Sequence, residues 1–345
     1  MQYYDFENNN VSRVFKGNWQ LAGGHGQIDE EQALKDLFVF VEHGINTFDV
    51  GDIYTGAEET LGEFLDQYGN KYGKTEASKI RVHTKFVPDL NALEDLTKED
   101  VRTVVERSIK RLGTQALNLV QFHWWDYALG DFVQAATYLD ELRKEGLIEA
   151  IGLTNFDCDH TQQLLDAGIP IVSNQVQFSL IDYRPFNGML ELAKDQDIDL
   201  FCYGTLAGGL LGSSKAKYDP TNRSHIKYDL MIKETGVEHY QEVLSTLSLL
   251  AEKYDTSVAN IAIQFVLQTD GVSSAIIGPR NTRHIKELDQ LDGLVLDDAD
   301  YSLLEGLAKK SLLKDQDVYS YERDMTTPHA QIMHYNNNNM RPGKA

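Results

Sequence analysis

The stretch NTFDVGDIYTGAEETLGEFL, residues 46–65, carries a strand, a loop and a helix in that order. Its first five residues are mostly apolar or β-branched, as in a buried strand. From Ala57 the apolar residues recur at helical spacing, and two acids occupy the first turn, where the helix dipole favours them. A strand followed by a helix is the unit from which parallel sheets are built.

The same alternation runs along the whole chain. Further strands are predicted at 18–21, 80–86, 117–124, 148–154, 171–175, 199–204 and 273–278, and their continuous apolar character is typical of strands covered on both faces. Helical periodicity marks 29–44, 57–69, 97–113, 131–146 and 238–255. About eight strands alternating with helices predict an α/β fold, a (β/α)8 TIM barrel with an N-terminal capping segment.

A doubly wound open sheet is the alternative fold. That fold usually carries a G-x-G-x-x-G turn after its first strand, and GGHG at 23–26 does not match it. We therefore expect one barrel domain over residues 1–345, with its core at about 10–325. A long loop at about 205–240 is expected on the active face. The tail after residue 310 is predicted to be irregular, with its last ten or so residues loose.

The composition of the chain argues against some classes of binding partner. The net charge of −21 argues against nucleic acid or an anionic membrane, because both attract clustered Lys and Arg. No apolar stretch approaches ~18 residues, and the first residues lack the pattern of a signal peptide, so we expect a cytoplasmic protein. The two cysteines, Cys158 and Cys202, are expected to be free thiols.

Four ionisable side chains fall at the C-terminal ends of three predicted strands, the end at which barrel enzymes carry their chemistry. Asp49, Lys85 and His123 close these strands, and Tyr54 follows Asp49 in the next loop. Each alone has an ordinary explanation: Asp49 could cap a helix, Tyr54 could line a pocket, Lys85 could be a surface lysine, and His123 could be a core histidine. A lysine buried at a strand end needs an ion pair, however, and Asp49 is the nearby candidate.

Together these four residues suit the reduction of a carbonyl group. A carbonyl that accepts hydride becomes an alkoxide, which needs a proton, and Tyr54 is the natural donor. A free phenol has a pKa of ~10, which Lys85 is expected to lower while Asp49 holds the lysine. His123 is expected to donate a hydrogen bond that positions and polarises the carbonyl.

The chain resembles the aldo-keto reductases over about residues 10–325. The resemblance rests on residues 46–65 and on VHTKF, SIKRLGTQALNLVQFHWWDY, LRKEGLIEAIGLTNF, NQVQFSLIDYRP, CYGTLAGGLL and IIGPRNTRHIKEL. It implies a (β/α)8 barrel that binds a nicotinamide dinucleotide without a Rossmann fold. It also implies that Tyr54 is the general acid, that Lys85 and Asp49 adjust the pKa of Tyr54, and that His123 orients the substrate.

The cofactor contacts are implied by the resemblance. They are Asn18, Trp19, Asp49, Thr154, Asn155, Gln175, Tyr203, Gly204, Thr205, Leu206, Gly278, Arg280, His284 and Glu287. Thr154, Asn155 and Gln175 are implied to hold the nicotinamide carboxamide, and Tyr203 to stack on its ring. As alternatives, Thr154 and Asn155 could cap the following helix, and Tyr203 could be a core residue.

Arg280, in GPRNTRHIKEL, is implied to contact a 2′-phosphate, so NADP(H) is the expected cofactor. NAD(H) stays open, because Gly278–Pro279 stands where many members have Lys-Ser, and Leu288 where many have Asn. No metal is expected.

The substrate is predicted to be a small-molecule carbonyl compound, in a pocket lined by Trp19, Tyr54 and Trp124. HWWDY departs from the commoner His-Trp-Pro, so the pocket shape stays open, as does the oligomeric state. Two other functions are open: a redox-sensing regulatory module similar to potassium-channel β subunits, and a sugar or alcohol dehydrogenase working in the oxidative direction.

Overall fold

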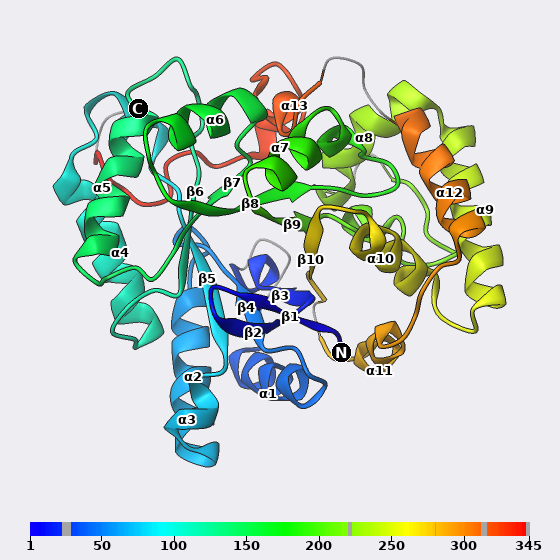
Figure 1. Cartoon of the computed structure of the whole chain (residues 1–345), viewed down its shortest axis with the longest axis horizontal. Coiled ribbons are helices and arrows are strands. Elements are labelled where there is room, and N and C mark those ends of the chain that lie inside the picture. Colours follow the sequence, from blue (N-terminus) through cyan, green and yellow to red (C-terminus); the bar gives the residue numbers. More distant parts are fainter. Residues whose placement is uncertain (23–28, 220–222, 280, 312–315, 343–345) are drawn as a thin grey trace.

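Eight parallel strands close into a barrel in the order β10-β3-β4-β5-β6-β7-β8-β9 (Figure 1). The computed structural model describes residues 1–22, 29–219, 223–279, 281–311 and 316–342. The strands are β3 Val14–Gly17, β4 Thr47–Asp49, β5 Arg81–Phe86, β6 Leu119–Phe122, β7 Ile151–Thr154, β8 Ile171–Gln177, β9 Asp199–Tyr203 and β10 Val272–Ile277. The predicted TIM barrel is confirmed.

The first barrel strand lies earlier than predicted. Residues 18–21 were expected to form it, but β3 ends at Gly17 and the chain turns into the short 3-10 helix η1, Trp19–Ala22. Asn18 lies at this turn, and its backbone N–H and its side-chain amide both donate to the Asp49 carbonyl at 2.9 Å. The backbone N–H of Asn18 is thereby tied to the end of β4 as the chain leaves the barrel wall.

An antiparallel hairpin precedes the barrel, in the place of the predicted capping segment. It consists of β1 Tyr3–Phe6 and β2 Asn9–Ser12. The Phe6 ring packs against Phe201 and His83, with centroid distances of 5.3 and 5.6 Å. Phe6 and Phe201 belong to a small hydrophobic cluster that contains no helix residue, which places it inside the barrel.

Helices surround the barrel (Figure 1). They are α1 Glu30–Glu42, α2 Ala57–Tyr72, α3 Lys74–Ala77, α4 Lys98–Leu112, α5 Phe132–Lys144, α6 Cys158–Asp166, α7 Met189–Asp195, α8 Arg223–Thr235, α9 Val237–Lys253, α10 Val258–Gln268, α11 Ile285–Leu288, α12 Asp298–Ala308 and α13 Ser320–Arg323. Local sequence sets their ends: Thr97 and Asp100 form a capping box at the start of α4, and Gly113 closes α4 with φ 65°.

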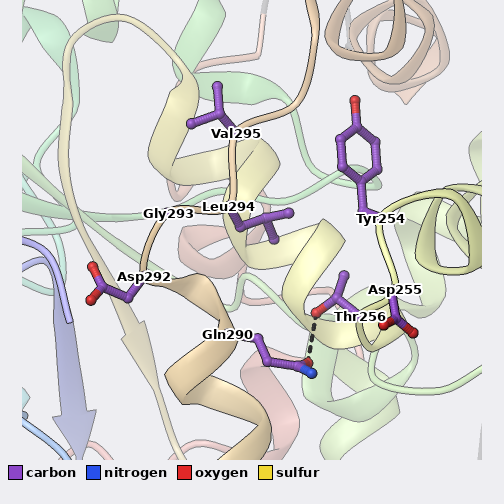
Figure 2. Close-up of a pocket in the computed structure, with 8 residues that line it drawn as sticks. All are labelled: Tyr254, Asp255, Thr256, Gln290, Asp292, Gly293, Leu294 and Val295. Atoms are coloured by element: carbon purple, nitrogen blue, oxygen red, sulfur yellow. Dashed lines mark hydrogen bonds between the residues drawn. The ribbon is translucent and has the colours of Figure 1, made fainter.

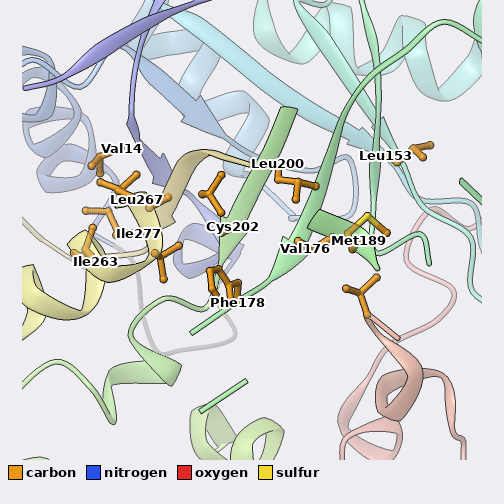
Figure 3. Packing of buried hydrophobic residues seen from close by; sticks show 14 of the residues in the cluster. Val14, Leu153, Val176, Phe178, Met189, Leu200, Cys202, Ile263, Leu267 and Ile277 are labelled. Carbon is orange, nitrogen blue, oxygen red and sulfur yellow. The ribbon is translucent and has the colours of Figure 1, made fainter. Parts of the chain in front are cut away.

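The larger core lies between the barrel wall and the helices. In Figure 3, Val14 of β3 and Ile277 of β10 lie near Ile263 and Leu267 of α10. All four side chains are buried. Alternate strand residues therefore face outward to the helices or inward to the smaller cluster, which is why the strands read as continuous apolar runs.

The segment at 205–240 was predicted to be one long loop. The structure differs from that prediction, because the segment contains α8 and the start of α9. Tyr228, Met231 and Ile232 bury one face of α8. Their spacing of three and four residues is helical, but polar residues between them make the period weak in the sequence.

The prediction of a loose C-terminal end is wrong for residues 338–341. Asp89 accepts hydrogen bonds from the backbone N–H groups of Asn338 at 2.7 Å and Met340 at 2.6 Å. Arg341 pairs with Asp95 and Asp100 at 2.9 and 2.8 Å. The tail thus binds the segment between β5 and α4, although it has little regular structure of its own.

Candidate active site

Asp49 and Lys85 form a buried ion pair at the ends of β4 and β5. The Lys85 Nζ donates to Asp49 Oδ1 and Oδ2 at 2.9 and 2.8 Å, and to the Val50 carbonyl at 2.8 Å. The side chains are only 5% and 7% exposed. Burial alone would lower the pKa of the Lys85 ammonium, but the Asp49 carboxylate and the Tyr54 phenol together outweigh it, so the net pKa is raised.

Two glutamines complete the surroundings of Asp49. Gln121 of β6 and Gln175 of β8 donate their amide N–H groups to Asp49 Oδ1 at 2.9 and 2.6 Å. Gln175 also donates to Gln121 Oε1 at 2.8 Å. Gln175 was implied to hold the nicotinamide carboxamide instead, and Gln121 was not predicted. The available signal was that Gln121 is the single polar residue of β6.

Tyr54 lies in the loop between β4 and α2, beside this pair. The Lys85 Nζ is 5.0 Å from the centroid of the Tyr54 ring. Gly51 lies against both side chains, since a Cβ added there would be in ordinary van der Waals contact with Tyr54 at 3.4 Å and with the stem of Lys85 at 3.5 Å. Three of the four predicted residues, Asp49, Tyr54 and Lys85, therefore come together.

The pKa of Tyr54 moves opposite to the expectation. Burial raises it, and this effect is larger than the lowering caused by Lys85. The phenol therefore stays protonated at neutral pH, which suits a proton donor, while Lys85 is placed to stabilise the phenolate once the proton has left.

His123 follows β6, and its two ring nitrogens have different surroundings. Nδ1 lies 3.1 Å from the Thr154 carbonyl oxygen, whereas Nε2 is buried without a partner among the described residues. Burial and the Arg323 charge lower the pKa of His123 to about 3, so the ring is neutral. A carbonyl oxygen only accepts hydrogen bonds, so Nδ1 carries the proton and Nε2 presents a lone pair. This geometry makes Nε2 an acceptor, opposite to the predicted donor.

The residues expected to hold the carboxamide gather at the ends of β7, β8 and β9. Asn155 has φ 63°, and its Oδ1 accepts from the Tyr203 hydroxyl at 2.7 Å. Within the described chain, Asn155 Nδ2 and Gln175 Oε1 make no hydrogen bond, which leaves one donor and one acceptor. This pair fits the carboxamide of a nicotinamide. Thr154 and Asn155 do not cap α6, because Asp157 does.

Tyr203 ends β9 and is accompanied by a cation. Lys227 of α8 lies 4.3 Å from the centroid of its ring and donates to its hydroxyl at 3.3 Å. Gly204 follows with φ 72°, and a side chain there would meet the Tyr228 hydroxyl at 2.6 Å. The backbone at 204–206 is thus closely packed against α8, with Thr205 buried and Leu206 partly buried.

The predicted adenosine-phosphate segment is described in part. Gly278 lies against the Gln20 side chain, where an added Cβ would meet Nε2 at 2.3 Å. His284 and Glu287 bind each other at 2.7 Å on the surface. Arg280 lies outside the described residues.

The predicted pocket tryptophans are placed differently from each other. Trp19 is 45% exposed, whereas Trp124 is fully buried and donates to the Leu129 carbonyl at 3.1 Å. Trp125 is the tryptophan beside the site, with its ring centroid 4.4 Å from that of His123. Two tail residues join it: Tyr319 lies 5.5 Å from His123, and Tyr335 lies 5.0 Å from Trp125. No periodicity in the tail could have indicated them.

A separate surface pocket lies away from these residues. Figure 2 shows that Tyr254, Thr256, Gln290 and Leu294 are among the side chains that line it, and none of the predicted site residues does. In the part of the chain that the structure describes, no cluster of His, Cys, Asp or Glu could hold a metal ion, and Cys158 and Cys202 form no disulfide. No described helix is both long and apolar enough to cross a membrane.

Comparisons with known proteins agree with this architecture. The model of the aldo/keto reductase family matches residues 13–309. The aldo-keto reductase YhdN of Bacillus subtilis is 26% identical over 295 residues, which cover 84% of this chain and 88% of that protein. The NADH-specific methylglyoxal reductase of Escherichia coli is 25% identical over 319 residues, covering 87% and 95%.

Solved structures show the same fold. The glycerol dehydrogenase AKR11B4 from Gluconobacter oxydans superposes with a TM-score of 0.75, at 24% identity, covering 90% of this chain and 95% of that one. The thermostable aldo-keto reductase Tm1743 gives a TM-score of 0.72 at 20% identity, covering 89% and 100%.

Proposed function

Since the chain belongs to the aldo/keto reductase family, we propose that it reduces an aldehyde or ketone to an alcohol, with NAD(P)H as the hydride donor and Tyr54 as the general acid. The observation that carries the proposal is the buried pair of Asp49 and Lys85 beside the Tyr54 ring. A buried ion pair is costly to assemble and is weak evidence for stability alone, which favours a chemical role at the mouth of the barrel.

The cofactor, when bound, supplies a hydride to the carbonyl carbon. The carbonyl oxygen then takes the proton of the Tyr54 hydroxyl, which leaves a phenolate. The Lys85 ammonium stabilises that charge, and Asp49 keeps the lysine in place. Solvent returns the proton to Tyr54 after the alcohol leaves. The free amide groups of Asn155 and Gln175 would hold the carboxamide, which orients the nicotinamide ring.

Tyr54→Phe tests the role of the phenol. The ring and its packing are kept and only the hydroxyl is lost, so carbonyl reduction should slow by ~10²–10⁴-fold, the usual contribution of a general acid. The dissociation constant for the dinucleotide, from tryptophan fluorescence, should hardly change. Tyr72→Phe, on the exposed side of α2, makes the same chemical change far from the site and should be neutral. Wild-type turnover by Tyr54→Phe would remove Tyr54 from the mechanism.

The finer proposal is that NADPH binds more tightly than NADH. It rests on Arg280 in GPRNTRHIKEL, because a guanidinium is suited to a phosphate, whereas the Escherichia coli relative is named NADH-specific. Arg280→Ala should weaken NADPH roughly 10- to 100-fold, as for a loss of ~1.5–3 kcal/mol, and leave NADH little changed. Equal weakening of both dinucleotides in direct titrations would show that Arg280 does not recognise the 2′-phosphate.

A further inference from the structure

Tyr319 is an unexplained residue at the mouth of the barrel. Its backbone is left-handed, with φ 61°, a conformation that L-residues other than Asn and Asp seldom adopt. The residue is only 6% exposed, and its hydroxyl makes no hydrogen bond within the described part of the chain. Strain of this kind persists only where the surroundings hold it, and it gathers at functional sites.

Two neighbouring charges hold Tyr319 in place. Glu322, three residues on, accepts two hydrogen bonds of 2.9 Å from the buried guanidinium of Arg184. Arg323 lies 5.2 Å from the centroid of the Tyr319 ring, and it donates to the carbonyl oxygens of Trp124 and Asn155 at 3.1 and 2.9 Å. The tail is thus fixed to the loops that follow β6 and β7, and Tyr319 is fixed with it.

The Tyr319 ring lies next to the reacting groups. It meets the His123 ring edge to face, at 84°. Its phenol is close enough to those of Tyr54 and Tyr203 for electrostatic coupling between them. Burial raises the pKa of Tyr319, so the hydroxyl stays neutral and can donate a hydrogen bond.

Two polar groups without a hydrogen-bond partner among the described residues therefore belong to adjoining rings, those of Tyr319 and His123. The Tyr319 hydroxyl can donate, and His123 Nε2 can only accept. A buried acceptor without a partner is costly, so a ligand group that satisfies both is favoured over an apolar group of the same size. A hydroxyl group can do so, because it accepts one hydrogen bond and donates another.

We propose that Tyr319, together with His123 Nε2, is a specificity-determining residue that selects carbonyl substrates with a hydroxyl group on the carbon next to the carbonyl. The inference rests on the proposed reductase function. The substrate hydroxyl accepts from Tyr319 and donates to Nε2, while the reacting carbonyl accepts from Tyr54. A second carbonyl at that carbon could use only Tyr319, since it has no proton to donate.

The test compares lactaldehyde with 2-methylpropanal, which has a methyl group in place of the hydroxyl. Tyr319→Phe should lower kcat/KM for lactaldehyde roughly 3- to 10-fold, as expected for one hydrogen bond, and change 2-methylpropanal less than ~2-fold. The ratio of kcat/KM between variant and wild type is taken for each aldehyde separately, so the different extents to which the two aldehydes are hydrated in water cancel. The ring and its contacts with His123 and Arg323 are kept, and an unchanged melting temperature confirms the fold.

Binding is measured separately with unreactive amides of the same shapes. Lactamide should bind the dinucleotide-loaded wild type more tightly than isobutyramide does, with the difference reduced in Tyr319→Phe, followed by fluorescence of Trp125 beside His123. An equal effect on both aldehydes and both amides, or none on either, would overturn the role of Tyr319. If Tyr54→Phe abolishes reduction while Tyr319→Phe shows no selectivity, only this inference fails. If the wild type reduces neither aldehyde with either dinucleotide, the proposed function fails, and the amides alone decide whether Tyr319 recognises a hydroxyl.

Discussion

Lys85→Met should destabilise the protein strongly, because it leaves the Asp49 carboxylate buried without its counter-charge. Breaking a buried ion pair from one side typically costs ~3–5 kcal/mol. Asp49 keeps the amide hydrogen bonds from Gln121 and Gln175, at 2.9 and 2.6 Å, which compensate part of the lost charge. We therefore expect a loss of about 3 kcal/mol in the free energy of unfolding.

Asp49→Asn removes the other charge of the pair and should cost at least as much, because it leaves the Lys85 ammonium buried with only neutral partners such as the Val50 carbonyl at 2.8 Å. The double variant Asp49→Asn/Lys85→Met removes both charges. It should lose only about 1–2 kcal/mol, so the two changes should be strongly non-additive.

Urea unfolding at pH 7, followed by tryptophan fluorescence, measures the free energy of unfolding of all three variants. The slope of that free energy against urea concentration should be the same across the set. Lys35→Met is the matched control, because it removes a lysine from an exposed pair with Glu31 and should have no measurable effect. If the double variant loses the sum of the single losses, the two residues are not coupled, and the ion pair is not what holds Lys85 beside Tyr54.

Two further predictions concern the contact between the tail and the loop before Tyr54. Asn338→Ala removes hydrogen bonds of 2.8 Å to Asp52 Oδ2 and the Val87 carbonyl, and should lower the free energy of unfolding by ~1–3 kcal/mol in urea, whereas exposed Asn337→Ala should not. Burial, and to a smaller extent the Glu58 charge, raises the pKa of Asp52 to about 7. The folded state therefore binds this proton more tightly than the unfolded chain does, and the free energy of unfolding should fall as pH rises from about 4 to 7. Relative to the wild type, Asp52→Asn should gain up to about 3 kcal/mol between pH 5 and pH 8, and parallel pH profiles of the two proteins would contradict the assignment.

The barrel and the strand-end positions of the candidate catalytic residues could be predicted because both depend on local patterns. Asp49, Lys85 and His123 each follow a short apolar run, and the ends of parallel strands in a barrel meet at one mouth. The ion pair follows from the same reasoning, since a buried lysine needs a carboxylate. The roles of the two nitrogens of His123 could not be predicted, because they depend on the Thr154 carbonyl of another strand.

The contacts of the C-terminal tail show where local sequence patterns fail to predict structure. Asp89 binds Asn338 and Met340 across 249 and 251 residues, and nothing in the polar run NNNN indicates such partners. Tyr319 likewise is positioned through Glu322 and Arg323. Only the folded chain brings these two residues to their partners, the Arg184 guanidinium and the carbonyl oxygens of the loops after β6 and β7. The net pKa of Tyr54 was mispredicted for a related reason: the sequence shows the neighbouring cation but not the depth of burial.

Asp49 receives side-chain hydrogen bonds from three other strands, through Lys85 of β5, Gln121 of β6 and Gln175 of β8. The acceptability of a residue at any one of these positions therefore depends on the other three. A change that a diverging lineage could tolerate in one sequence background would be harmful in another, so this part of the barrel should show strong epistasis. Exchanges here are expected to be concerted, and a single site transplanted from a distant relative should fail where the whole set succeeds.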